Sequence, residues 1–251
     1  MKIYTKEIFI DTEDFLTFFI FSHFTYFQLN KGLLPYLEKL VSLEDKLVNL
    51  KQEPNVTLYF WPLGINENRE PDLLIQIING EYYDFLFEIK TGASPSNNEI
   101  EISTDNNGNE IVRGYQLNDQ HRDFMNFGKY ETYENINDFA RNKNIILKSK
   151  IENRYHIYLT HHDKANKPIE DIEVNFNKYE KKSKILWSNW QFLHSFLENL
   201  KNNVNSYEKT IINVMQDILY GKGFYEFNGF NHKLYYDIKI EPNSAFFWSC
   251  K

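Results

Sequence analysis

The sequence contains very little cysteine, and Cys250 is its single thiol. One cysteine excludes an internal disulfide framework and is typical of a reducing compartment, so we expect the protein to be cytoplasmic. The N-terminus lacks the order of basic, apolar and small residues that marks a secretory signal peptide. The most apolar stretch, residues 15–29, contains His23 and is too short to span a bilayer. It predicts a buried helix and no membrane association.

Positive charge is also scarce, because 28 lysines and arginines face 35 acidic residues and leave a net charge of −7. This balance argues against a protein that coats nucleic acid, but it is compatible with an enzyme that holds nucleic acid at one site. Hydrophobic residues make up 42% of the 251 residues, which is enough for a substantial core. No internal repeat and no linker composition is visible, so we expect one large domain, with or without a small appendage.

Apolar periodicity and turn residues predict the order of the elements. We expect helices at 13–29, 33–50, 112–127, 187–204 and 207–219, and strands at 55–63, 72–78, 81–91 and 154–160. Residues 92–111 predict a mobile loop, and residues 223–240 a β-hairpin. Three consecutive strands followed by a helical crossover predict an α/β fold with a mixed sheet flanked by helices. Residues 1–204 would form this domain, and residues 205–251 a C-terminal helix and hairpin extension packed on it.

The strand at 81–91 ends on a polar pair. Its side chains alternate between two faces, so Glu88 and Lys90 project together at the end of one face. The other face is purely apolar and must pack inward, through Tyr83, Phe85, Phe87 and Ile89.

The turn between the two central strands decides whether Asp72 meets this polar pair. A two-residue turn at 79–80 would set Asp72 opposite Phe87, on the wrong face. A three-residue turn at 79–81 sets Asp72 opposite Glu88 and keeps the apolar faces of both strands together. Burial therefore favours the three-residue turn.

Two carboxylates that face each other across a strand pair repel, unless a cation lies between them or one is protonated. Mg²⁺ prefers oxygen ligands, and Asp72, Glu88 and the carbonyl of Ile89 could supply three. A bound metal ion would activate water as a nucleophile, and Lys90 would orient that water or neutralise charge in the transition state. The simpler interpretation is that solvated strand faces often carry such residues without any function.

Pro71-Asp72 and Glu88-Ile89-Lys90, in this order of helices and strands, resemble the PD-(D/E)XK nuclease superfamily, the restriction-endonuclease-like fold. The match covers about residues 10–200, with identity confined to a few motif positions. The resemblance implies a metal-dependent phosphodiesterase that uses Mg²⁺, with Mn²⁺ as a substitute. It implies Asp72 and Glu88 as metal ligands and Lys90 as the catalytic lysine.

Two further residues follow from the same resemblance. Many members carry an acid on the first helix, which residues 12–17 resemble, so we expect Glu13 to be catalytic and a metal ligand, with Asp14 as the alternative. The helix dipole also favours acids there without any catalytic role. Some members carry a glutamine on the helix after the Glu-x-Lys strand, for which we choose Gln116 over Gln120. A solvated helix face would explain either glutamine equally well.

The sequence thus predicts a Mg²⁺-dependent endonuclease that hydrolyses DNA phosphodiester bonds, with RNA as an open alternative. A role in prokaryotic antiviral defence or restriction is an analogy with the superfamily. Cutting both strands would need two sites, which a homodimer would supply. The competing hypotheses are a binding module on an inactive nuclease fold, and an interaction protein that docks through its aromatic C-terminal segment. We interpret Trp187 and Trp190 as packing residues, with base stacking as the alternative.

Overall fold

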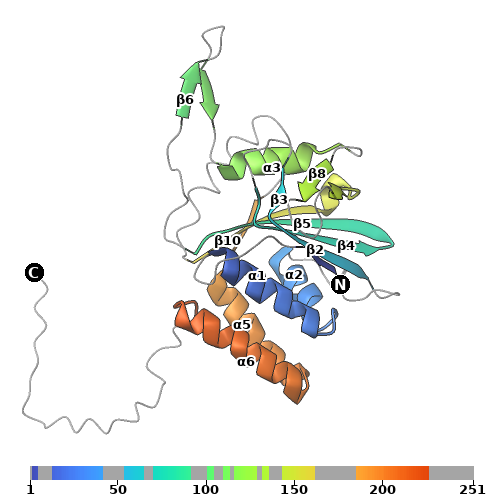
Figure 1. The fold of residues 1–251 in the computed structure, drawn as a ribbon, viewed down its shortest axis with the longest axis vertical. Helices are drawn as coiled ribbons and strands as arrows, with labels where there is room; N and C mark the ends of the chain where they lie inside the picture. Colours follow the sequence, from blue (N-terminus) through green and yellow to red (C-terminus); the bar gives the residue numbers. More distant parts are fainter. Residues whose placement is uncertain are drawn as a thin grey trace, which may run out of the picture.

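The structure is a computed structural model that describes residues 2–4, 13–41, 54–64, 70–91, 101–104, 110–113, 116–128, 132–135, 143–161 and 185–225. Its centre is a six-stranded mixed sheet with the strand order β1-β2-β4-β5-β10-β11 (Figure 1). These strands are β1 (Lys2–Tyr4), β2 (Asn55–Phe60), β4 (Leu73–Asn79), β5 (Glu81–Ile89), β10 (Arg154–Thr160) and β11 (Ile185–Asn189). β2, β4 and β5 are antiparallel neighbours, while β1–β2, β5–β10 and β10–β11 are parallel pairs. The prediction of a mixed sheet is confirmed.

Helices cover both faces of this sheet, as predicted. The helices are α1 (Glu13–His23), α2 (Leu33–Val41), α3 (Gln116–Asn126), α5 (Trp190–Leu200) and α6 (Ser206–Gly221), with short 3-10 turns at Phe24–Tyr26, Ile151–Asn153 and Lys201–Asn203. α1, α2, α5 and α6 lie on one side of the sheet and α3 on the other (Figure 1). No helix among the described residues is long and apolar enough to cross a membrane.

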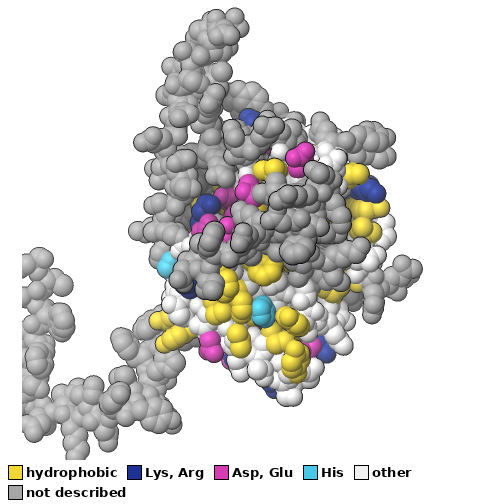
Figure 2. Space-filling view, in the orientation of Figure 1, with side chains coloured by type: hydrophobic (Ala, Val, Ile, Leu, Met, Phe, Trp, Pro, Cys, Tyr) yellow, Lys and Arg dark blue, Asp and Glu magenta, His cyan; other side chains and the backbone are white. Residues whose placement is uncertain are grey.

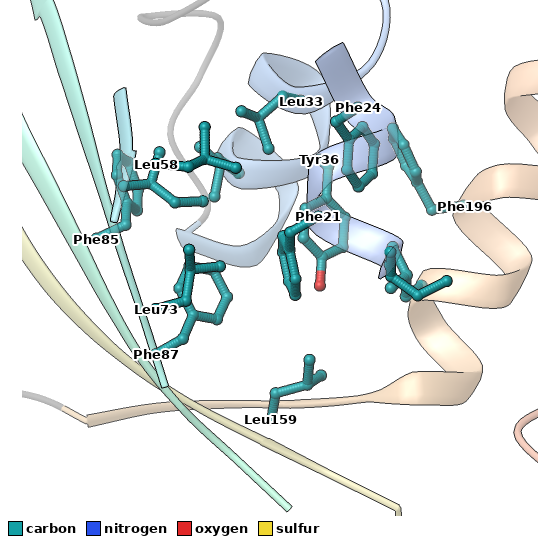
Figure 3. Packing of buried hydrophobic residues seen from close by; sticks show 14 of the residues in the cluster. Phe21, Phe24, Leu33, Tyr36, Leu58, Leu73, Phe85, Phe87, Leu159 and Phe196 are labelled. Carbon is teal, nitrogen blue, oxygen red and sulfur yellow. The ribbon is translucent and has the colours of Figure 1, made fainter. Parts of the chain in front are cut away.

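The side with four helices contains the main hydrophobic core (Figure 3). Phe85 and Phe87 of β5 point into it, where Phe87 meets Phe21 of α1 with ring centroids 5.2 Å apart. Residues of α6, including Ile212 and Met215, are buried in the same core. The described part of the predicted C-terminal extension, residues 205–225, therefore packs into the core of the main sheet. The division of the chain at residue 204 stays a prediction.

Several boundaries differ from the predictions. Short strands β6 (Glu101–Thr104) and β7 (Glu110–Arg113) pair where a loop was expected, so α3 begins at Gln116 and not at residue 112. The late helix begins at Trp190, because the residues before it form β11 and Asn189 caps the helix by accepting a hydrogen bond from the Phe192 amide at 2.7 Å. Residues 42–50 and most of the predicted C-terminal hairpin, 226–240, lie outside the described residues.

The turn between β4 and β5 has the predicted register. Ile78 pairs with Tyr82 and Asn79 with Glu81, so only Gly80 lies between the paired residues. Gly80 has a φ of 67°, a left-handed conformation that a residue with a side chain rarely adopts. This register turns the apolar side chains of both strands to the same core, as burial requires.

The second face of the sheet carries a smaller core with a buried polar border. Leu74 and Leu86 pack there beneath α3 and a small three-stranded sheet. In this sheet β8 (Thr132–Asn135) lies between β3 (Pro62–Leu63) and β9 (Lys143–Ile146). Arg154 is buried at this border and donates to the carbonyls of Phe124 and Phe127, at 2.8 and 2.9 Å, beside the C-terminal end of α3. This guanidinium fixes the position of α3 relative to the sheet.

A fully buried histidine pair lies between α3 and β10. The Nδ1 atoms of His121 and His156 are 3.2 Å apart, so one ring donates a hydrogen bond to the other, and the rings stack with an interplanar angle of 12°. Burial lowers the pKa of His121 to about 4. Burial, and then the neighbouring His121, lowers the pKa of His156 well below its usual value. Both rings are therefore neutral at pH 7.

This pair predicts that stability falls on acidification. A histidine with a lowered folded-state pKa contributes fully to stability above its unfolded value of about 6.5 and loses that contribution as the pH falls. Between pH 6.5 and 4.5 the free energy of unfolding should fall by up to about 1.4 kcal/mol per pH unit for each histidine. Urea unfolding at several pH values measures this slope. The double variant His121→Leu/His156→Leu should flatten it. An unchanged slope in the double variant contradicts the interpretation.

Candidate functional site

Asp72 immediately precedes β4 and continues the β4–β5 register. The last paired residues are Leu73 and Phe87. Asp72 and Glu88 are the next residues of the two segments, and the charge of Glu88 acts on the Asp72 carboxyl. The Asp72 amide donates to the Phe87 carbonyl at 3.1 Å, and the Asp72 carboxylate accepts a hydrogen bond from the Ile89 amide at 2.5 Å. The two predicted acids therefore lie on the same face of the sheet, as the three-residue turn requires.

Each oxygen of the Glu88 carboxylate contacts one side chain. Only 2% of the residue is exposed. Its Oε1 lies 2.7 Å from the Lys90 ammonium, and its Oε2 accepts a hydrogen bond from the Gln120 amide of α3 at 2.8 Å. Both oxygens of this buried carboxylate thus have a partner within the chain.

Glu13 reaches the same cluster from the first residue of α1. Its Oε2 accepts hydrogen bonds from the amide and hydroxyl of Thr91, at 2.6 and 3.1 Å, and its Oε1 lies 3.5 Å from the Lys90 ammonium. Asp14, the alternative, instead accepts a hydrogen bond from the indole of Trp61 at 3.0 Å. Of the two acids, the structure brings Glu13 to Lys90. Acidic and basic side chains lie side by side near the N-terminal end of α1 (Figure 2).

The two glutamine candidates have different outcomes. Gln116 is the first residue of α3, and its side chain lies outside the described part of the chain. Gln120 is buried one turn further along α3, where its amide reaches Glu88. Gln116 is the sequence-based choice because it comes first along this helix. The position of α3 over the sheet instead brings Gln120, the alternative, to Glu88.

Burial and the neighbouring charges shift the pKa values of Asp72, Glu88 and Lys90 in the cluster that these residues form with Glu13. Burial and the nearby Glu88 raise the pKa of Asp72 well above its usual value, while Lys90 and the Ile89 amide oppose this rise. Burial also raises the pKa of Glu88, against the effects of Lys90 and Gln120. Burial alone would lower the pKa of Lys90, but the charges of Asp72, Glu88 and Glu13 raise it, so this side chain stays an ammonium.

Tyr158 of β10 is a member of this environment that the sequence did not single out. It pairs with Glu88 in the parallel β5–β10 ladder and is buried. Burial raises its pKa to about 12, with Lys90 opposing and the acids reinforcing the rise, so its phenol stays protonated. Alternation along residues 154–160 could have separated Tyr158 from the core-facing residues, but its partner on β5 is a property of the tertiary structure.

The donor chemistry fits a magnesium ion only in part. Asp72, Glu88 and the Ile89 carbonyl are hard oxygen donors of the kind that Mg²⁺ binds, and this ion needs only one or two carboxylates beside waters and substrate phosphate. Within the described ranges, however, no group of three or more His, Cys, Asp or Glu side chains is arranged to hold a metal ion. Glu13 is bound by Thr91 and Lys90, and Glu88 by Lys90 and Gln120, so either carboxylate would have to exchange a partner in order to bind an ion.

No family model, curated protein or solved structure matches this chain. The resemblance to the PD-(D/E)XK superfamily therefore depends on the motif residues and their arrangement.

The raised pKa of Asp72 predicts that its charge costs stability. A carboxylate with a raised folded-state pKa favours the folded state below its unfolded value, and that contribution is lost as the pH rises through the folded value. Asp72→Asn should therefore raise the free energy of unfolding at pH 7 by about 1–3 kcal/mol in metal-free protein, because Asn keeps the hydrogen bond from Ile89. The gain should shrink as the pH falls toward 4.

Urea unfolding of the wild type and the variant at pH 7 and pH 4 measures this difference. Asp217→Asn on the exposed face of α6 makes the same chemical change and should alter stability by less than about 0.5 kcal/mol. If Asp72→Asn is less stable than the wild type at pH 7, then the buried charge is not a cost.

Proposed function

We propose that this protein is a metal-dependent nuclease that hydrolyses phosphodiester bonds in DNA, on a restriction-endonuclease-like fold of the PD-(D/E)XK type. The observation that carries the proposal is the proximity of two buried acids and one lysine: the charges of Glu88 and Lys90 act on Asp72, and the Lys90 ammonium lies 2.7 Å from Glu88. Structural ion pairs rarely bring two buried acids together beside one lysine, because each buried charge is costly. Perturbed acids of this kind gather at functional sites.

Asp72, Glu88 and the Ile89 carbonyl would hold Mg²⁺ or Mn²⁺. When bound, the ion would supply an activated water and stabilise negative charge on the phosphate. Lys90 contributes a permanent positive charge beside the acids, suited to the charge that develops on phosphate oxygens. Gln120 keeps Glu88 in one orientation, and Glu13 with Thr91 fixes the position of the ammonium.

The proposed setting is cytoplasmic, in prokaryotic defence or restriction, by analogy with the superfamily. The second candidate is a binding module on an inactive nuclease fold. It is favoured by one observation, that within the described residues no three acidic or histidine side chains are placed to hold a metal ion. The two candidates differ in whether DNA is cut when a divalent ion is supplied.

Cleavage assays test the proposal directly. Purified protein with plasmid, single-stranded circular DNA or RNA should cut DNA in Mg²⁺ or Mn²⁺, and EDTA should abolish cutting. Asp72→Asn and Lys90→Met should each lower the rate at least about 100-fold, since each removes charge beside the reacting phosphate. Because Asp72→Asn is expected to be more stable than the wild type, its lost activity could not be attributed to unfolding.

Lys209→Met on the exposed surface of α6 is the matched control for Lys90→Met and should cut at the wild-type rate. A wild type that binds DNA but cuts neither DNA nor RNA with any divalent ion would favour the binding module. Cutting that persists in Asp72→Asn would exclude this site.

A further inference from the structure

The row that contains the two acids continues across the sheet to a tryptophan. Glu88 pairs with Tyr158 of β10, and Tyr158 pairs with Trp187 of β11. Three paired residues thus lie in one line across the neighbouring strands β5, β10 and β11, and Asp72 lies beside the Glu88 end of this line. Because neighbouring strands are about 4.8 Å apart, Trp187 lies about 10 Å from Glu88 along this line.

Trp187 projects from the same face of the sheet as the acids. Its indole N–H donates to the hydroxyl of Thr160 at 2.9 Å, and Thr160 follows Tyr158 on the same face of β10. The preceding residue, Leu186, packs against the main core on the opposite face. The alternation along β11 therefore directs Trp187 away from the four-helix side and toward the site.

The two tryptophans at this point have different environments. Trp190 is fully buried, lies 5.6 Å from Phe224 in a stacked arrangement and donates to the Lys90 carbonyl at 3.3 Å, so it is a packing residue. Trp187 is half-buried on the outermost strand of the sheet. Its hydrogen bond to Thr160 fixes the plane of a ring that is still partly accessible.

A partly exposed indole, fixed in orientation beside a phosphate-binding site, is suited to stacking on a nucleobase. Base–aromatic stacking contributes about 1–3 kcal/mol per base and tolerates any sequence. In a duplex both faces of each base are already covered by neighbouring bases, so only an unpaired base offers a free face. The site would thus distinguish single-stranded from double-stranded nucleic acid, and it would not distinguish base sequences.

We propose that Trp187 is a stacking platform for the base next to the cleaved phosphodiester, so that single-stranded DNA is the preferred substrate. This inference rests on the proposed function of the acid pair. It names the substrate class that the acids and Lys90 alone leave open.

Binding to a fluorescein-labelled oligothymidylate, measured by anisotropy in the inactive Asp72→Asn background at fixed salt, tests the platform. Trp187→Leu should weaken binding about 5- to 150-fold, which corresponds to the stacking of one base. Trp187→Phe, which keeps an aromatic ring, should stay within about 5-fold of the background protein. Tyr207→Leu, which removes a 64%-exposed ring on α6, should bind as the background protein does.

An oligonucleotide series with one abasic position moved along the chain isolates the stacked base. The background protein should lose affinity at one position by about the same factor as Trp187→Leu, and Trp187→Leu should lose nothing further there. This coupling separates stacking from any general effect of the substitution on folding. Equal losses in both proteins at every abasic position would overturn the platform.

Cleavage by proteins with the wild-type Asp72 separates this inference from the proposed function. If the wild type cuts DNA, prefers single strands, and Trp187→Leu loses that preference, then both proposals stand. If the wild type cuts and Trp187→Leu cuts and binds without change, then the platform is wrong and the nuclease stands. If the wild type never cuts but the abasic coupling is present, then the nuclease is wrong and stacking stands. An absence of oligonucleotide binding overturns both.

Discussion

The pairing of β4 with β5 through Gly80 is the constraint on which the candidate site depends. A left-handed Gly80 lets Asn79 pair with Glu81, and every later pair follows from that start. Phe85 and Phe87 then point into the main core, and Asp72 comes to lie beside Glu88. Because side chains alternate with a period of two, a slip of one residue would expose those aromatic rings and separate the acids. Burial of the core therefore enforces the position of the acids.

The buried charges of the cluster lower the stability of the folded state, and the surrounding structure offsets this loss. Two buried acids with raised pKa values weaken the folded state at neutral pH, and a single ammonium shared by Glu88 and Glu13 compensates only part of this. The large apolar core on the other face supplies the stability. Arg154 adds rigidity, because it joins the end of α3 to the sheet and so holds the helix that carries Gln120. Such an arrangement is more readily explained by chemistry than by stability.

The two parallel strands β10 and β11 extend the candidate site beyond the acids. They continue the row of the acids with Tyr158 and Trp187, both of which follow from pairing between segments about 70 and 100 residues from Glu88 in the sequence. The acids and the ammonium suit a phosphate, and the aromatic end of the row suits a base. Under the proposed function, they would together form a surface for one nucleotide of a strand.

Much of the fold was predictable because it depends on local patterns. Alternation in 81–91, the Asn79-Gly80 turn and the demand to bury both apolar faces were sufficient to place Asp72 beside Glu88. Local patterns failed at β6 and β7, which form a short hairpin where a loop was expected. They also failed at β11, where pairing with the distant strand β10 took the first residues of an expected helix. The choice of Glu13 over Asp14 depends on where Thr91 and Trp61 lie, and the role of Gln120 depends on how α3 lies over Glu88 of β5. The sequence by itself therefore determined the central hairpin and its acid pair, whereas the tertiary structure decided which side chains surround it, because contacts between distant segments leave no periodic trace in the chain.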